Sequence, residues 1–160
     1  MKNNMWQENV RNVWRTMPYW LRRSIVRLTQ PSFTVSAGAI IFDDSERVLL
    51  LNHVLRPAKS GWGIPGGFLN DGEQPEKTVR REMLEEANLE IFDLRLFSAQ
   101  TSGRHVEILY LARGNGEITI TSREIVEGKW FNANDLPQGL PDNQRRQIEI
   151  AIDSREKSEL

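Results

Sequence analysis

The residues of this chain that are best suited to do chemistry are three glutamates within RREMLEEANL, residues 80–89: Glu82, Glu85 and Glu86. Like charges at neighbouring positions repel one another and destabilise an isolated helix. Either these carboxylates form a solvated face, supported by basic side chains four residues away, or a positive group lies between them. Carboxylate oxygens select hard cations, with Mg²⁺ first and Mn²⁺ possible.

The helical geometry of this stretch places the carboxylates beside the expected core and leaves both alternatives open. The apolar residues that would form a core-facing stripe are Val79, Met83 and Ala87. At about 100° per residue, Glu86 comes next to that stripe, then Glu82 and then Glu85, all within an arc of roughly 100°. Carboxylates at the edge of a core must be protonated or bind cations if basic partners are too few. A cation site beside this helix and a solvated face with i,i+4 ion pairs both fit these residues, and the loop before the helix bears on the choice.

The elements that would position this helix follow from the pattern along the chain. Apolar runs and alternation predict strands at 33–42, 47–54, 93–102, 105–114 and 124–131. The first two strands would form a hairpin across the turn DDSE. A Gly- and Pro-rich loop, residues 56–76, precedes the glutamate helix, whose first turn suits Pro75, and a closing amphipathic helix is expected at 142–156. This order predicts an α/β sandwich around a mixed sheet.

The segment GFLNDGEQPEKTVRREMLEEANL, residues 67–89, resembles the Nudix box, G-x5-E-x7-R-E-U-x-E-E-x-G-U with U apolar. The matching positions are Gly67, Glu73, Arg81, Glu82, Met83, Glu85, Glu86 and Leu89. WGIPGG before the box and EGKWFNANDLP after it also look like this family, so the resemblance spans roughly residues 33–150. Asn88 stands where the box has glycine. We expect it to end the helix in the left-handed conformation, which Asn adopts second best to Gly.

The resemblance implies a Nudix-like α/β/α sandwich and a pyrophosphohydrolase. Its substrate would be a nucleoside diphosphate linked to another moiety, such as a nucleotide sugar, a dinucleotide or an NTP. The metal ligands would be Glu82, Glu85, Glu86 and the backbone carbonyl of Gly66, holding Mg²⁺, with Mn²⁺ as the second choice. The resemblance does not identify the substrate, and a Nudix-fold module that binds or senses a nucleotide without hydrolysis is the alternative.

The resemblance also implies supporting roles for other residues of the box. Arg81 would orient the carboxylates and pair with Glu73, which ties the loop to the helix. Gly67, together with Gly66, would permit a close approach of the backbone to metal and phosphate. The catalytic set would then consist of Glu82, Glu86, Arg81 and one glutamate outside the box, Glu124.

Family enzymes often place a general base outside the box, and SREIVEGKWF offers Glu124 and Glu127. In a strand these two would point to opposite faces, so only one can serve. The family habit of an acidic ligand several residues before the aromatic pair favours Glu124, with a solvated edge residue as the alternative. Arg56 could bind a substrate phosphate bidentately or be a surface residue. His53 and His105 could contact a base, although lone histidines on strands are more often structural.

Charge divides the chain unevenly. Residues 1–32 hold six basic side chains and one acidic one, a net charge of +5, so the rest holds −6 of the total of −1. We expect residues 1–32 to be an N-terminal helical extension, broken at Pro18, and residues 33–160 to be the Nudix hydrolase domain. Trp6, Trp14 and Trp20 lie about 80° and then 240° apart on one helix, so no single stripe holds them. This favours docking on the protein's own body or across a homodimer over an anionic membrane surface.

The composition excludes several classes of protein. With no cysteine, the chain has no disulfide framework, no thiolate metal site and no cysteine for a Nudix-fold isomerase. No apolar run approaches the roughly 18 residues of a membrane span, and the first residues lack the apolar core of a secretory signal. We therefore expect a cytoplasmic protein. The resemblance implies that it acts on a nucleotide-type small molecule, and we expect no nucleic-acid partner.

Overall fold

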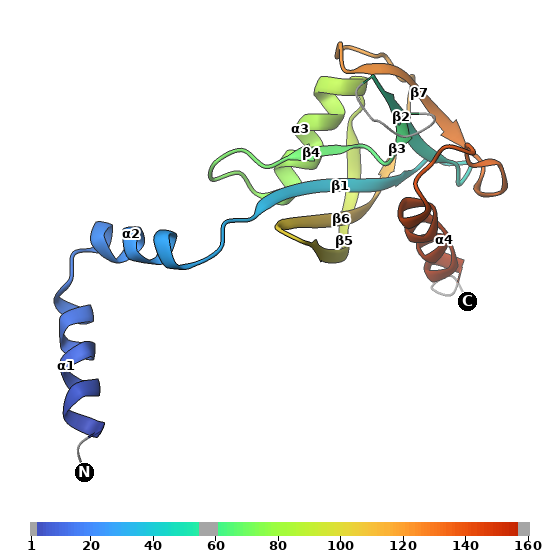
Figure 1. The fold of residues 1–160 in the computed structure, drawn as a ribbon. Helices are drawn as coiled ribbons and strands as arrows, with labels where there is room; N and C mark the ends of the chain where they lie inside the picture. Colours follow the sequence, from blue (N-terminus) through green and yellow to red (C-terminus); the bar gives the residue numbers. More distant parts are fainter. Residues whose placement is uncertain (1–2, 55–60, 157–160) are drawn as a thin grey trace. The chain divides into compact units, whose positions relative to one another are not determined.

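Two helices precede an alternating series of strands and helices. A computed structural model describes residues 3–54 and 61–156 of the chain. The chain divides into two units, Met1–Phe33 and Thr34–Leu160, and Figure 1 shows the elements of each.

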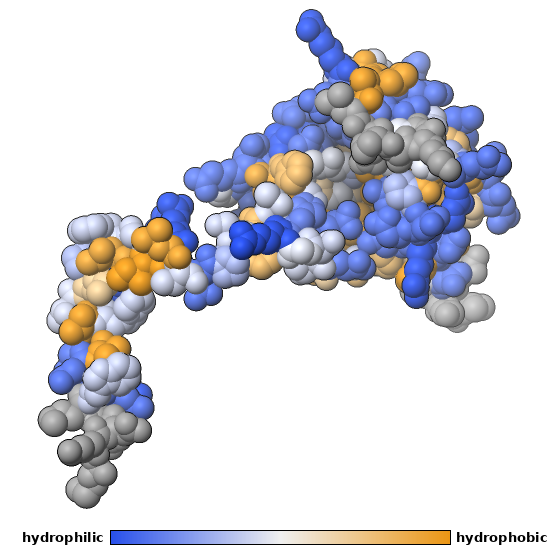
Figure 2. All heavy atoms as spheres, in the orientation of Figure 1, coloured by the Kyte–Doolittle hydropathy of each residue, from blue (hydrophilic) through white to orange (hydrophobic). Residues whose placement is uncertain are grey.

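The first unit consists of α1 (Asn3–Thr16) and α2 (Tyr19–Thr29), separated at Pro18 as the sequence predicts. Proline is tolerated next to a helix start but not in a helix interior. The exposed large apolar residues of α1 are Trp6, Val10, Val13 and Trp14. They recur four, seven and eight residues from the first, so they share one face of α1; Figure 2 shows apolar residues along these helices. The docking of this face on the protein's own body or across a homodimer stays a prediction. No helix in the described ranges is long and apolar enough to cross a membrane.

The second unit is built on one mixed sheet, which contains seven strands within the described residues. The strands are β1 (Thr34–Phe42), β2 (Val48–His53), β3 (Trp62–Gly63), β4 (Gly66–Phe68), β5 (Ile91–Ser102), β6 (His105–Gly114) and β7 (Ile125–Phe131). Their order is β3-β2-β1-β6-β5, with β4 paired to β1 and β7 paired to β2. β1 and β6 are parallel, and the other pairs are antiparallel.

Helices cover both faces of the sheet, α3 (Pro75–Ala87) on one side and α4 (Asp142–Glu156) on the other (Figure 1). Successive residues of β1 serve the two cores in turn. Ile41 packs in the core that contains Val79 and Met83 of α3, whereas Ile40 packs in the core that contains Ile148 of α4. A strand that is buried on both faces needs the continuous apolar run seen in its sequence. The predicted α/β/α sandwich with a mixed sheet is confirmed.

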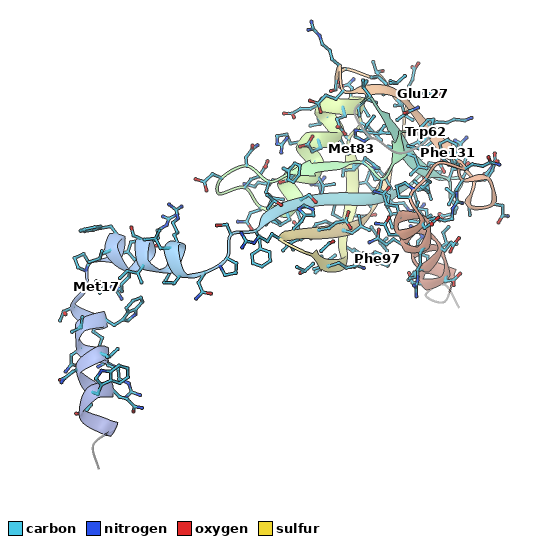
Figure 3. The ribbon with its side chains drawn as sticks, viewed as in Figure 1. Met17, Trp62, Met83, Phe97, Glu127 and Phe131 are labelled. Carbon is cyan, nitrogen blue, oxygen red and sulfur yellow. The ribbon has the colours of Figure 1, made fainter. Side chains whose placement is uncertain are left out.

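Two aromatic residues, Trp62 and Phe131, belong to the core that packs against α4. The rings of Trp62 and Phe131 meet edge to face, with centroids 5.0 Å apart and planes at 83°. Figure 3 shows these two side chains at the β3 and β7 end of the sheet, with Met83 between α3 and the strands. This edge-to-face contact fixes the short strand β3, which leads into the glycine loop before α3.

Two predictions about the strands need correction. The hairpin of residues 33–42 and 47–54 exists only beside its turn, where Phe42 is opposite Val48. Further along, β4 occupies the edge of β1, and β2 pairs along its length with β7. The predicted loop 56–76 also contains two short strands, β3 and β4, because extended glycines can still pair with a neighbouring strand.

Candidate active site

The helix that carries the glutamates begins and ends as the sequence predicts. Pro75 is its first residue, and Asn88 follows its last residue with φ 47° and ψ 40°, the left-handed conformation. The Asn88 N–H donates to the Leu84 carbonyl at 3.2 Å, and the Leu89 N–H donates to the Met83 carbonyl at 3.2 Å. These bonds satisfy carbonyl groups that the end of a helix leaves open.

The three glutamates differ in burial in the order that the helical geometry predicts. Glu86, next to the apolar stripe, is 6% exposed. The side chain of Glu82 is 15% exposed and that of Glu85 is 59% exposed. The stripe itself, Val79, Met83 and Ala87, is fully buried. The carboxylates therefore run from the edge of the core out to solvent.

The positive group between the carboxylates is Arg81. Its Nη1 donates to Oε1 of Glu82 at 2.7 Å and to Oε2 of Glu85 at 3.1 Å. Its Nε and Nη2 donate to the two carboxylate oxygens of Glu73 at 2.9 and 3.0 Å. Nη2 also donates to the backbone carbonyl of Phe68 at 3.2 Å. One guanidinium thus joins β4, the following loop and α3.

The pairing of Arg81 with Glu73 is reflected in their acid–base properties. The hydrogen bond from Arg81, followed by the backbone N–H of Asn70, lowers the pKa of Glu73 from 4.5 to about 2. The bonds to Glu73 and then to the helix glutamates raise the pKa of Arg81 further above its usual range. The bidentate pair is therefore fully ionised at neutral pH.

Glycines bring the loop backbone close to both the sheet and the glutamates. A Cβ on Gly66, whose φ is +153°, would lie 2.5 Å from the Ala37 carbonyl oxygen of β1. A Cβ on Gly67 would lie 2.1 Å from Oε1 of Glu82. The backbone at Gly66 and Gly67 is therefore packed between β1 and the carboxylate of Glu82, an approach that a larger residue would block.

The residues around α3 fit a hard divalent cation by the chemistry of their donors. Glu82 and Glu86 are four residues apart on one helix face, and Glu82 lies against the glycine backbone. All of these candidate metal ligands are oxygen atoms, and the carboxylate of Glu86 is buried at the edge of the core. Within residues 3–54 and 61–156, no three His, Asp or Glu side chains are grouped closely enough to hold a metal ion. In this arrangement Arg81 forms ion pairs with both Glu82 and Glu85.

The candidate residues outside the box lie on β7 or just before it. Glu124 precedes β7; its N–H bonds to Ser122 Oγ at 3.1 Å, and its carbonyl accepts the Val54 N–H at 2.9 Å. Both Glu124 and Glu127 are exposed, and Figure 3 labels Glu127 on β7. The assignment of Glu124 as the base stays a prediction. Arg56 lies outside the described residues.

Two threonines that the sequence did not single out join this region to α3. The N–H of Thr119 donates to the Ala87 carbonyl at 3.0 Å, and the N–H of Thr121 donates to the Glu86 carbonyl at 3.2 Å. Thr121 Oγ1 also donates to the Glu85 carbonyl at 2.7 Å. The segment before Glu124 is thus fastened to the end of the glutamate helix. The only sequence signal was the alternation within EITITS.

A cleft of about 190 Å³ begins at the glycine loop and continues on the α4 face of the sheet. Its polar and aromatic lining residues are Ser36, Phe68, Glu107 and Gln144. His105 lies beside it, with Nδ1 2.9 Å from Thr34 Oγ1 and Nε2 2.9 Å from Ser36 Oγ. Both ring nitrogens of His105 therefore have hydroxyl partners, which indicates a structural role.

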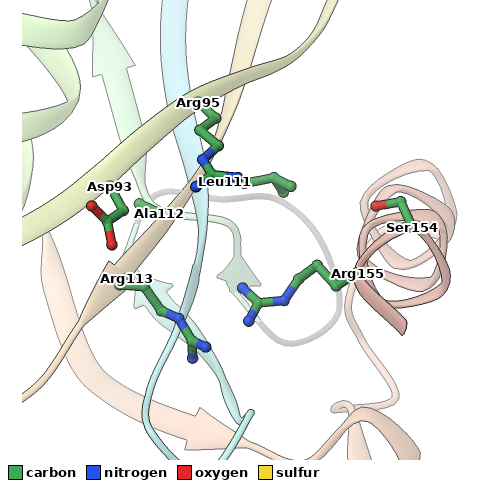
Figure 4. A pocket seen from close by; sticks show the side chains of 7 residues that line it. All are labelled: Asp93, Arg95, Leu111, Ala112, Arg113, Ser154 and Arg155. Atoms are coloured by element: carbon green, nitrogen blue, oxygen red, sulfur yellow. The ribbon is translucent and has the colours of Figure 1, made fainter. Parts of the chain in front are cut away.

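A separate cavity of about 470 Å³ lies between β5, β6 and α4, as Figure 4 shows. Three arginines line it: Arg95, Arg113 and Arg155. Glu46 pairs with Arg113 at 2.6 Å and with Arg155 at 2.9 Å. Because one carboxylate already neutralises two of these guanidinium groups, and because no lining residue comes from α3 or from the glycine loop, we keep this cavity apart from the candidate site.

Comparison with known proteins defines the class to which this fold and site belong. The NUDIX domain family matches residues 32–150. That range covers most of the chain, so the chain belongs to the NUDIX family. The matched range contains the mixed sheet, α3 and the glycine loop described above.

Individual relatives cover part of the chain. It is 30% identical over 107 residues to 8-oxo-dGDP phosphatase NUDT18 of Homo sapiens, covering 64% of this chain and 33% of that protein. It is 33% identical over 102 residues to the NAD-capped RNA hydrolase NudC of Enterobacter sp. (strain 638), covering 62% of this chain and 38% of that protein. The chain thus spans little more than a third of the length of these relatives.

Solved structures share the fold. A MutT NUDIX hydrolase from Burkholderia pseudomallei is 30% identical, with a TM-score of 0.65, and covers 74% of this chain and 98% of that one. A NUDIX hydrolase from Nitrosomonas europaea has a TM-score of 0.70 at 22% identity and covers 80% of this chain and 74% of that one.

Proposed function

We propose that this protein is a metal-dependent hydrolase that cleaves the diphosphate linkage of a nucleoside diphosphate derivative. The observation that carries the proposal is the position of Glu82, which lies against the glycine backbone and is followed one turn later by the buried Glu86. The names of the two relatives support it, because 8-oxo-dGDP and NAD both contain a nucleoside diphosphate.

The cation would be Mg²⁺, with Mn²⁺ possible. It would be held by Glu82, Glu86 and the backbone carbonyl of Gly66, with Glu85 as a further ligand from the exposed side. When bound, such a cation neutralises charge on the diphosphate and lowers the pKa of an attacking water.

Other side chains position the reacting groups. Arg81 keeps the carboxylates of Glu82 and Glu85 in place, and Glu73 anchors Arg81 from the loop side. Glu124 is the proposed general base, which would accept a proton from water at its carboxylate. Arg56 is proposed to bind a substrate phosphate.

The fold and composition suit a cytoplasmic enzyme that acts on a small nucleotide, with a homodimer as its proposed assembly. The alternative, a nucleotide-binding module without hydrolysis, would bind the same ligands but leave them intact.

The test is product detection across nucleotide sugars, dinucleotides, NTPs and dNDPs with Mg²⁺ or Mn²⁺. We expect at least one of these to yield a nucleotide product, with the loss of turnover on chelation. A panel that binds but is never cleaved, with either metal, would contradict the enzyme and favour the binding module.

A further inference from the structure

Three residues of the cleft beside the glycine loop lie in one row across the α4 face of the sheet. Across β1, Ser36 is opposite Phe68 of β4 on one side and opposite Glu107 of β6 on the other. Residues directly opposite one another in a sheet point to the same face. Gly66 and Gly67 also line this cleft, so it shares the glycine loop with the proposed diphosphate site.

Glu107 supplies hydrogen-bond acceptors to the cleft. It is half-buried, and within residues 3–54 and 61–156 no basic side chain forms an ion pair with it. The Nε2 of Gln147 approaches its Oε2 only at 3.5 Å, a long contact. An ionised carboxylate is acceptor-only. A half-buried carboxylate with one weak partner suits a ligand that offers two adjacent N–H groups.

Gln144 supplies the opposite kind of group. Its Oε1 accepts the backbone N–H of Ile64 at 2.9 Å, and this bond fixes the orientation of the amide. The amide nitrogen is then the group of Gln144 that can serve a ligand, and it can only donate. The cleft therefore combines one donor with the two oxygens of Glu107.

Guanine matches this combination best among the common bases. Its Watson–Crick edge presents the O6 acceptor, then the N1–H donor and then the N2–H donor. Adenine offers one donor and one ring acceptor there, and cytosine offers one donor, one ring acceptor and a carbonyl, so each can bond to only one oxygen of Glu107. Uracil places a carbonyl on each side of its N–H, so one carbonyl would face the carboxylate. Unpaired buried acceptors and facing acceptors both weaken binding.

Phe68 supplies a surface that any base can use. Its side chain is 64% exposed, and its ring meets His105 edge to face with centroids 5.7 Å apart. Since His105 is held by Thr34 and Ser36, Phe68 rests on a fixed neighbour. A base can stack on such a ring whatever its edge carries.

We propose that this cleft is a guanine-selective base site, in which Glu107 accepts the N1–H and N2–H of guanine, Gln144 donates to O6 and Phe68 stacks on the ring. This inference rests on the proposed function only for the position of the phosphates. In this arrangement Glu107 and Gln144 bond to N1–H, N2–H and O6 and make no contact at C8. These residues therefore give no preference between guanine and 8-oxoguanine.

The test is equilibrium binding of GMP, IMP and AMP to the full chain by calorimetry. IMP is the matched ligand, because its base keeps O6 and N1–H and lacks only the N2 amino group. We expect GMP to bind about tenfold or more tightly than IMP and AMP. Glu107→Gln should reduce the difference between GMP and IMP to about threefold or less.

Two further variants separate selectivity from general damage. Phe68→Ala should weaken all three nucleotides by a similar factor. Glu149→Gln, an exposed position of α4, should change none of them. Equal affinities in the unaltered protein, no saturable binding up to millimolar nucleotide, or an unchanged preference in Glu107→Gln would each overturn the base site. Hydrolysis of diphosphates without a preference for guanine would contradict the guanine site but not the proposed hydrolase. Selective binding of GMP without hydrolysis would contradict the hydrolase but not the guanine site.

Discussion

Gly67 and Glu82 lie so close that a Cβ on the glycine would be 2.1 Å from Oε1 of the glutamate. The position of Glu82 therefore depends on residue 67 having no Cβ. Arg81 approaches the same Oε1 at 2.7 Å, so this carboxylate is held between backbone and guanidinium. This contact links the glycine of the box to its glutamates.

The first prediction contrasts the two glycines. Gly67→Ala should fold, because its Cβ would meet only the far end of a flexible side chain, but turnover should fall about tenfold or more as Glu82 is displaced. Gly66→Ala should instead lower the free energy of unfolding by about 2 kcal/mol or more, since its Cβ would meet the backbone of β1. Thermal melts and steady-state rates of both variants check this. Gly67→Ala with full activity would show that the position of Glu82 is unimportant.

The second prediction concerns acid stability. Because the folded pKa of Glu73 is about 2 and its ordinary value is 4.5, the ionised pair stabilises the fold at neutral pH. That stabilisation is complete above about pH 4.5 and is lost as the pH falls towards 2. The difference in melting temperature between the unaltered protein and Glu73→Gln should therefore be constant above pH 4.5 and shrink below it. A difference that stays constant down to pH 2 would contradict the low pKa.

The third prediction concerns the departure from the box. Asn88→Gly should change the free energy of unfolding by less than about 1 kcal/mol and leave activity nearly unchanged. Asn88→Val should destabilise the protein by more than the glycine variant, because a β-branched residue resists the φ of 47° found there. Urea titrations compare the two variants. Equal stability of Val and Gly would argue against a left-handed residue in solution.

The fourth prediction concerns residues 1–32. Trp6 and Trp14 share the apolar face of α1, and Trp20 belongs to the separate helix α2. Removing residues 1–30 should lower the melting temperature or dissociate a dimer without abolishing hydrolysis, if these faces dock on protein. Light scattering and melts of both forms test this. Co-sedimentation of the full chain, but not the truncation, with anionic liposomes at physiological salt would point to a membrane surface instead.

Local sequence predicted the glutamate helix in detail. Angular position alone ordered the burial of Glu86, Glu82 and Glu85, because the period of a helix and the position of its apolar stripe are both local properties. The left-handed conformation of Asn88 was predicted from the family resemblance, because Asn88 stands where the box has glycine. The ion pair of Arg81 with Glu73 came from the family resemblance rather than from spacing.

Features that depend on long-range pairing could not be predicted from the sequence. Glu107 and Gln144 share a cleft only because β6 runs parallel to β1 and α4 covers that face. Thr121 contacts α3 from the segment EITITS, whose alternation does not show which element it packs against. The length of the hairpin was overestimated because the sequence does not show that β4 competes for the edge of β1.

The measurement that tests the central claim most directly is the turnover number of Glu86→Gln on whichever nucleoside diphosphate derivative is cleaved. Glutamine keeps the shape of this buried side chain but removes its charge, so circular dichroism spectra should match those of the unaltered protein. The metal-dependent account predicts that kcat falls by at least about 100-fold and that chelation abolishes the activity of the unaltered protein. Full kcat in Glu86→Gln would contradict it.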